Sequence, residues 1–224
     1  MAASPPTAAP DRLRAQVLAD WAPVVPLGSP WRRAARLAPL AALMAGIAAI
    51  YWGPQPDWGA PGFALTVSLS ALQWMAGAGL LGLALREAVP GRTAGRATIL
   101  AVLGGVVVLL ALNLTAKDAV AAALVPSGRE WRFWAICLRG PLLLASPVLV
   151  LGSVFAARAF PTRPAWAGAL AGLAAGVLID AGWRLGCFVT DASHVAGAHW
   201  LAIGVSSVLG AALVSLADTI RWRR

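Results

Sequence analysis

The sequence predicts an all-α polytopic membrane protein with six transmembrane helices and with both termini in the cytoplasm. Hydrophobic residues make up 59% of the 224 residues, charged residues only 12%, and the mean hydropathy is +0.74. An ordinary soluble domain carries roughly 25% charged residues, about twice as many. Apolar stretches of membrane-spanning length, with arginines between them, complete the argument for this fold class.

Six apolar stretches are long enough for a helix to cross about 30 Å of hydrocarbon. They cover residues 37–53, 62–85, 97–116, 133–157, 164–187 and 195–216. Tryptophans such as Trp52, Trp131 and Trp166 fall near their ends, where an indole ring is buried while its N–H contacts water. The chain therefore divides into an N-terminal segment (1–36), a transmembrane domain (37–216) and a short basic tail (217–224).

The placement of the arginines predicts the orientation of these spans. When the spans alternate in direction, most of the 18 basic residues fall on the side of the N-terminus. These residues are Arg12, Arg14, Arg32, Arg33, Arg36, Arg86, Arg92, Arg96, Arg158, Arg163, Arg221, Arg223 and Arg224. Positively charged loops stay in the cytoplasm, so this side, with both termini, is predicted to be cytoplasmic.

The N-terminal segment is predicted to form a short helix outside the membrane, at residues 11–21. Asp11 is suited to cap its start, and Pro23 lies just beyond its end. Its apolar side chains are Leu13, Val17, Leu18 and Trp21. The proline-containing stretch that follows favours an extended conformation and includes Val24, Val25, Pro26 and Leu27. Such a stretch serves either to bind a groove in a protein or to link the helix to the membrane surface.

The fifth span has a stripe of small residues. Gly168, Gly172 and Gly176 recur every four residues, so they share one face of an α-helix. Small residues let the backbone of a neighbouring helix approach closely within a membrane. We therefore expect this face to pack against another span.

Charged residues continue the same stripe. Asp180 and Arg184 follow the glycines at the same spacing and can pair with each other, and Arg139 in the fourth span is a second candidate partner for Asp180. Charged side chains at membrane depth usually have a function, but an ion pair that holds helices together explains these residues equally well.

The two cysteines are predicted to meet. Cys137 lies near the start of the fourth span and Cys187 at the end of the fifth, so both fall on the side away from the termini. Two thiols there can form a disulfide or bind a soft metal ion. His194 and His199, at the start of the sixth span, would add imidazole ligands suited to a zinc- or cadmium-like ion. The alternative is that each histidine is a hydrogen-bonded side chain at the membrane interface.

The sequence argues against two other classes of protein. It contains no G-x-S-x-G, H-E-x-x-H or P-loop motif, so we expect no enzyme activity. The net charge of +9 arises from arginines dispersed at the span ends rather than from a basic track, so we expect no direct contact with nucleic acid. We expect no resident cofactor, only transient capture of a heavy-metal ion at the cysteines.

Four stretches resemble the NrsF family of six-span bacterial membrane anti-sigma factors, and the resemblance extends over essentially the whole chain. They are VVPLGSPWRR, ICLRGPLLLASP, DAGWRLGC and the HW pair before the last span. The resemblance implies a protein of the bacterial inner membrane that holds an extracytoplasmic-function sigma factor until a periplasmic metal or oxidative stress releases it. Cys137 and Cys187 would be the sensing pair.

On this hypothesis the N-terminal segment binds the sigma factor. The binding residues would be Leu13, Val17, Leu18, Trp21, Val24, Val25, Pro26 and Leu27, with the short helix docked by its apolar side chains. The alternative is a small transporter or ion-conducting protein in which Asp180, Arg184 and Arg139 line a pathway. A transporter of this kind would need charged residues aligned in several spans, and the sequence lacks them.

Overall fold

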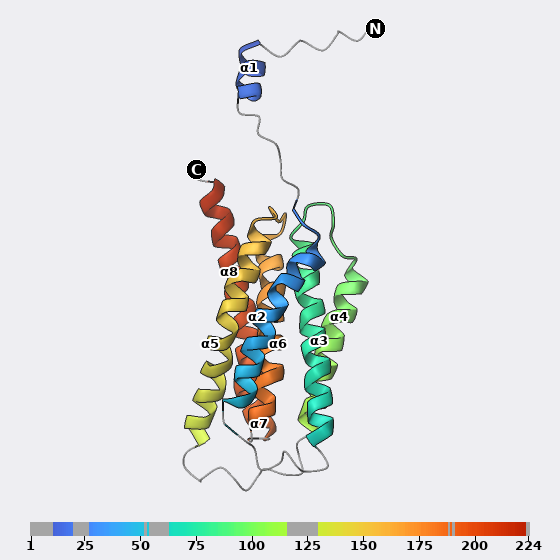
Figure 1. The fold of residues 1–224 in the computed structure, drawn as a ribbon, viewed down its shortest axis with the longest axis vertical. Helices are drawn as coiled ribbons and strands as arrows, with labels where there is room; N and C mark the ends of the chain where they lie inside the picture. Colours follow the sequence, from blue (N-terminus) through green and yellow to red (C-terminus); the bar gives the residue numbers. More distant parts are fainter. Residues whose placement is uncertain are drawn as a thin grey trace.

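The computed structural model describes residues 11–19, 27–51, 53, 63–115, 130–187, 189 and 191–222, and the secondary structure of these residues is helical. The helices are α1 (Asp11–Ala19), α2 (Pro30–Ile50), α3 (Phe63–Glu87), α4 (Arg96–Thr115), α5 (Glu130–Ala157), α6 (Pro164–Gly186), α7 (Ala192–His194), the π-helix η1 (Val195–Trp200) and α8 (Leu201–Trp222) (Figure 1). Because α7, η1 and α8 follow one another without a break, they form one long helix.

Among the described residues, six helices are long and apolar enough to cross a membrane, which confirms the predicted all-α fold with six spans for this part of the chain. They cover Pro30–Ile50, Phe63–Glu87, Arg96–Leu114, Trp131–Ala157, Pro164–Gly186 and Ala192–Arg221. Successive spans run in opposite directions, so α2 begins and α8 ends at the same end of the bundle (Figure 1). We call this the terminal end, and the opposite end, where α7 lies, the distal end.

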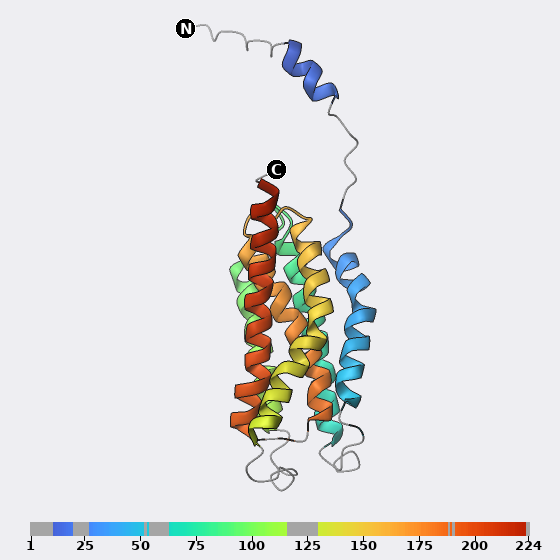
Figure 2. The same ribbon diagram turned by 90° about the vertical axis from the view of Figure 1, so that its left-hand side faces the viewer.

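The bundle is organised around α6, the most buried of the six spans. It contacts α8, α3, α5 and α2, whereas α4 packs chiefly on α3 at the edge. Figure 2 shows α2 and α8 at opposite sides of the bundle. A central helix in contact with four others is well placed to connect them.

The glycine stripe of α6 faces α8. A Cβ atom at Gly168 would meet the backbone oxygen of Gly210, and one at Gly172 would meet that of Ser206. Gly176 faces the Cα atom of Ile203 in the same way. The two backbones approach so closely because these positions have no side chain, which is the arrangement that small residues permit in a membrane.

The first span begins earlier than predicted, at Pro30 rather than at residue 37. The Ser29 hydroxyl accepts a hydrogen bond from the Arg32 amide at 3.3 Å, and Pro30 occupies the first turn, where its missing N–H is not needed. Arg33, assigned by the sequence to the loop before the span, is buried within the bundle. Its aliphatic stem and two hydrogen bonds to carbonyl oxygens stabilise the added turns.

The last span also extends further than predicted at both ends. It starts at Ala192, after the cap formed by Asp191, and continues to Trp222 rather than ending at residue 216. Arg221 stabilises the extra turns, because its Nη2 donates to the carbonyl oxygen of Ala157 at 2.8 Å and its guanidinium lies 3.9 Å from the ring centroid of Phe160. Most of the predicted basic tail is therefore helical.

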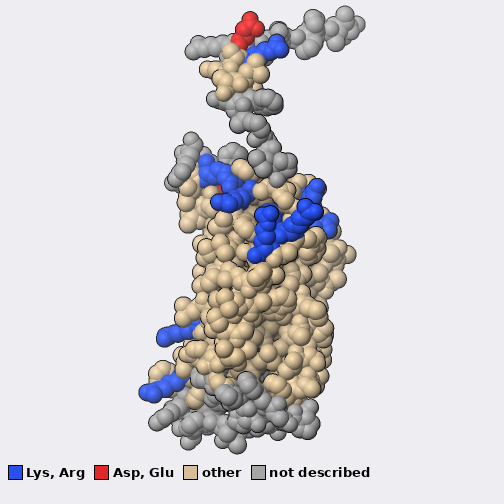
Figure 3. Space-filling view, viewed as in Figure 1, with Lys and Arg blue, Asp and Glu red and all other residues tan. Residues whose placement is uncertain are grey.

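Exposed arginines gather at the terminal end of the bundle (Figure 3). They include Arg32, Arg36, Arg86, Arg92, Arg96, Arg158 and Arg163. Toward the distal end, the exposed arginines among the described residues are Arg132 and Arg139. This asymmetry is the one that the positive-inside rule uses to predict a cytoplasmic terminal end.

Candidate thiol and imidazole site

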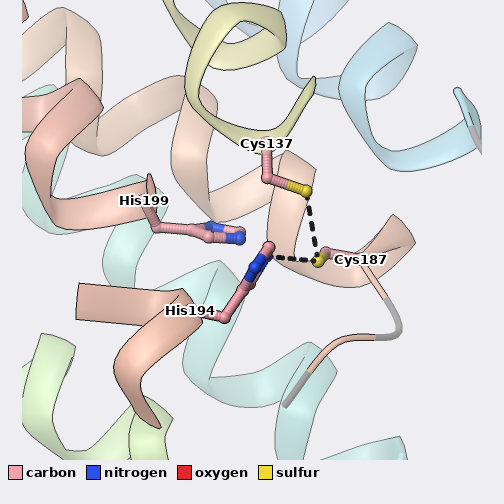
Figure 4. Close-up of side chains that lie close together, drawn as sticks. All are labelled: Cys137, Cys187, His194 and His199. Atoms are coloured by element: carbon pink, nitrogen blue, oxygen red, sulfur yellow. Dashed lines mark hydrogen bonds between the residues drawn. The ribbon is translucent and has the colours of Figure 1, made fainter. Parts of the chain in front are cut away.

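The distal end brings the two cysteines together. Cys137 lies in the second turn of α5, and Cys187 follows directly after α6. Their Sγ atoms are 3.6 Å apart, and their side chains are 1% and 3% exposed (Figure 4). No disulfide joins the two sulfurs in the structure. The sequence predicts that the two cysteines lie at the same level of the bundle, and their positions agree with this prediction. The reason is that α5 begins, and α6 ends, at the distal end.

Both histidines lie beside the two thiols. The Nε2 atom of His194 lies 3.8 Å from the Sγ atom of Cys187, and the rings of His194 and His199 are 5.6 Å apart, edge to face. Figure 4 shows both imidazole rings beside the thiols. Both histidines are buried, at 7% and 1% exposed.

The π-helix η1 explains why two histidines five residues apart face the same site. In an α-helix of 3.6 residues per turn, such residues point roughly 140° apart. A π-turn contains more residues, so residues five apart come closer to the same side of the helix. His194 directly precedes η1 and His199 lies within it. The sequence pattern contains no signal for this turn.

Asp191 caps the helix that carries His194. Its carboxylate accepts hydrogen bonds from the Ser193 hydroxyl and, at 3.0 Å, from the backbone N–H of His194. These bonds favour the charged carboxylate and hold the pKa of Asp191 below its usual value. The position of His194 thus depends on an exposed acid at the start of the helix.

The four side chains fit a soft divalent metal ion. One ligand atom from each of Cys137, Cys187, His194 and His199 lies within 4.8 Å of the other three. Ligand atoms on one tetrahedral zinc ion are roughly 3.3–3.8 Å apart, so side-chain rotations of about 1 Å would complete the site. Two sulfurs and two imidazole nitrogens are the donor set that zinc-like ions prefer. In addition, His199 Nε2 is buried without a hydrogen-bond partner among the described residues.

Asp180 supports this cluster from within α6. Its side chain is 0% exposed, its Oδ1 lies 2.7 Å from Nδ1 of His199, and its Oδ2 accepts a hydrogen bond from Nε2 of Gln73 at 2.8 Å. The sequence offered Arg184 and Arg139 as candidate partners of Asp180. Arg139 is exposed on α5, and Arg184 donates through Nη2 to the backbone oxygen of Asn113 at 2.7 Å.

Gln73 and Asn113 are two buried polar residues that the sequence patterns did not identify. Asn113 of α4 donates to the side-chain oxygen of Gln73 in α3 at 2.8 Å, and both side chains are 1% exposed. Each is a single amide within an apolar span, and that isolation is the signal that could have identified it. The two amides are buried and bonded, and they connect α3 to α4 and α6. This arrangement does not support the alternative of a transporter with a water-filled pathway.

The predicted partner-binding residues lie only partly within the described structure. Leu13, Val17 and Leu18 on α1 are 51%, 59% and 65% exposed, and Leu27, just before α2, is 50% exposed. Trp21, Val24, Val25 and Pro26 lie outside the described residues. The apolar side chains of α1 are therefore available for contact with another molecule.

The fold and the site define a multi-pass membrane protein with a buried cysteine and histidine cluster at one end of a six-span bundle. The model of the NrsF family, described as negative regulator of sigma F, matches residues 18–222. The chain belongs to this family, which is one of regulators and whose name indicates a sigma factor as partner. No curated protein and no solved structure matches the chain.

Proposed function

We propose that the protein is an anti-sigma factor of the bacterial inner membrane. With its terminal end in the cytoplasm, it holds an extracytoplasmic-function sigma factor through α1 and the stretch that leads into α2. Its distal end faces the periplasm and carries the sensor. The distribution of arginines supports this orientation. Family membership and the exposed leucines and valine of α1 support the binding of a sigma factor.

The signal is read by the thiol pair. A metal ion binds both thiols after their protons are lost, or an oxidant takes two electrons and two protons from them and leaves a disulfide between Cys137 and Cys187. A disulfide shortens the distance between the two sulfurs to about 2 Å and so draws the start of α5 toward the end of α6. A metal ion instead draws the two histidines toward thiols that already have the spacing of metal ligands. The observation that carries this proposal is the 3.6 Å separation of two buried thiols at the end opposite the termini.

The displacement reaches the terminal end through α5. At one end this helix carries Cys137, and at the other the carbonyl oxygen of Phe155 accepts a hydrogen bond from Arg33 at 2.9 Å. Arg33 lies in the first turn of α2, and α2 directly follows the lead-in stretch that ends at Ser29. Movement of α5 therefore disturbs the start of α2 and, with it, the surface that holds the sigma factor.

Cysteine replacement tests the sensor. We expect Cys137→Ser and Cys187→Ser to repress the regulon normally but to lose most of its induction by cadmium and by peroxide, measured with a transcriptional reporter. Ser207→Ala is the matched control, because this hydroxyl bonds Ala169 between α8 and α6 away from the thiols. Unchanged induction in both cysteine variants would remove the thiols from sensing.

Charge placed on α1 tests the partner-binding surface. We expect Leu13→Asp and Val17→Asp in the full-length protein to abolish co-purification with the cognate sigma factor and to raise basal transcription. Ala19→Asp adds the same charge to α1 at a position about 100° or more around the helix from Leu13, Val17 and Leu18, and it should leave binding intact. Equal binding by all three variants would move the interface to the turns between α3 and α4 or between α5 and α6.

A further inference from the structure

A chain of polar side chains runs from the thiol and imidazole site through the bundle. His199 contacts Asp180, Asp180 contacts Gln73, and Gln73 contacts Asn113, at 2.7, 2.8 and 2.8 Å. These four residues belong to η1, α6, α3 and α4. Each of them is at most 1% exposed, so every contact is made away from water.

The chemistry of these groups determines the direction of each hydrogen bond. A carboxylate only accepts, so Asp180 accepts from His199 Nδ1 and from the amide nitrogen of Gln73. The amide oxygen of Gln73 is then free to accept from the Asn113 amide, which also donates to the carbonyl oxygen of Leu109 at 3.0 Å. The network is consistent at every atom, and this consistency fixes the proton of His199 on Nδ1.

The remaining nitrogen of His199 faces the thiols. With Nδ1–H committed to Asp180, a neutral His199 carries its lone pair on Nε2. Nε2 is buried without a hydrogen-bond partner among the described residues, and its ring is one of the four groups gathered within 4.8 Å. Histidine ligands of metal ions typically donate their other N–H to a carboxylate, which orients the ring and selects the tautomer.

We propose that Asp180 is the positioning residue of the thiol and imidazole site, holding His199 with the Nε2 lone pair directed at Cys137 and Cys187. Gln73 and Asn113 hold Asp180 in turn, so that α3 and α4 contribute to the site without touching it. This inference rests on the proposed function only in that a soft metal ion is a ligand of the site. The tautomer and orientation of His199 belong to the protein itself.

Cobalt binding to the full-length protein in detergent micelles tests this role. In the wild-type protein, Co²⁺ should show thiolate charge-transfer bands together with the intense visible bands of a tetrahedral ion. Asp180→Asn keeps the volume but replaces one acceptor with a donor, so it cannot accept from both His199 and Gln73. We expect it to keep the charge-transfer bands, to lose most of the tetrahedral signature as His199→Ala does, and to weaken Co²⁺ binding by roughly 10- to 100-fold.

Nitrogen-15 NMR of the imidazoles tests the same role without metal. The chain has two histidines, and His194→Ala assigns the signals. Recorded at alkaline pH, where the imidazole is neutral, His199 should be the Nδ1–H tautomer in the wild-type protein and should shift toward Nε2–H in Asp180→Asn. Ser207→Ala is the control and should leave both the NMR and the cobalt spectra unchanged.

The two measurements separate failure of this inference from failure of the proposed function. A wild-type protein that binds no Co²⁺ but keeps His199 as Nδ1–H would contradict metal sensing and still support positioning by Asp180. Identical cobalt spectra and affinities in the wild-type and Asp180→Asn proteins, or an Nε2–H tautomer in the wild-type protein, would overturn the inference.

Discussion

The Arg33 guanidinium donates to the carbonyl oxygen of Leu85 at 2.8 Å, close to the C-terminal end of α3. Its other terminal nitrogen donates to the carbonyl oxygen of Phe155 near the C-terminal end of α5. The last carbonyl groups of a helix lack partners within it and carry partial negative charge, so a cation satisfies them well. One side chain thus connects the start of α2 to the ends of two other spans.

Replacement of Arg33 should loosen this junction. We expect Arg33→Met, which keeps much of the aliphatic stem, to lower the free energy of unfolding by roughly 2–4 kcal/mol, since two hydrogen bonds from a charged donor are lost. Basal transcription should rise because the start of α2 is no longer fixed to the ends of α3 and α5. Thermal unfolding in detergent and a transcriptional reporter measure the two effects. Arg32→Met, at an exposed neighbouring position, should change neither, and an equal effect there would contradict the role of Arg33.

The contact between α6 and α8 predicts a second stability effect. A Cβ atom at Gly172 would collide with the backbone of α8 at Ser206. We expect Gly172→Ala to lower the free energy of unfolding by about 1–3 kcal/mol, because the backbones must separate. Gly204→Ala on α8, where a Cβ meets nothing within 4 Å, should be neutral or stabilise by up to about 1 kcal/mol. Equal thermal unfolding of the two variants would argue against close packing at Gly172.

The thiol pair predicts an intramolecular cross-link. Treatment with diamide should oxidise Cys137 and Cys187 to a disulfide, since their Sγ atoms are already 3.6 Å apart. Mass spectrometry should show the loss of two hydrogen atoms from the monomer, and a thiol-specific reagent should then fail to label the unfolded chain. Cys137→Ser should remain a labelled monomer. Disulfide-linked dimers as the main wild-type product would contradict the geometry of the pair.

Asp191 predicts a pH dependence at the start of the last span. Its pKa is lowered by the Ser193 hydroxyl and the His194 amide, so its stabilising effect is present at neutral pH and is lost as the pH falls through the lowered pKa, below 3.8. Asp191→Ala should cause the same loss at neutral pH, about 1 kcal/mol, which corresponds to roughly fivefold faster amide exchange at His194. Hydrogen exchange measures this rate. Asp218→Ala is the control, and an unchanged rate in Asp191→Ala would exclude the cap.

Much of the fold could be predicted because a membrane restricts the choices. A span must satisfy its own backbone hydrogen bonds and must be long enough to cross the hydrocarbon, so apolar runs of sufficient length identify helices. The predicted ends were less accurate. The first span starts at Pro30 because Arg33 finds partners inside the bundle, and hydropathy averages cannot register a partner that is distant in sequence.

The site was predicted only in part, for a similar reason. The topology alone predicts that Cys137 and Cys187 lie at the same level of the bundle. Successive spans alternate in direction, so the position of a span in the order gives its direction. Sequence spacing offered Arg184 as a partner of Asp180, but it gave no sign of the two hydrogen-bonding partners, His199 and Gln73, that the fold brings to its two oxygens. The π-turn that directs both histidines to one site has no sequence pattern of its own.

The sequence by itself determined the class of the protein. Apolar length, arginine asymmetry and the small-residue stripe are local properties of the chain, and each has a direct physical consequence in a bilayer. Only the tertiary structure decided which polar side chains meet. A buried hydrogen bond depends on the rotation and depth of two helices packed together, so the link from the thiols through Asp180 to Asn113 exists only once α3, α4, α6 and η1 are assembled.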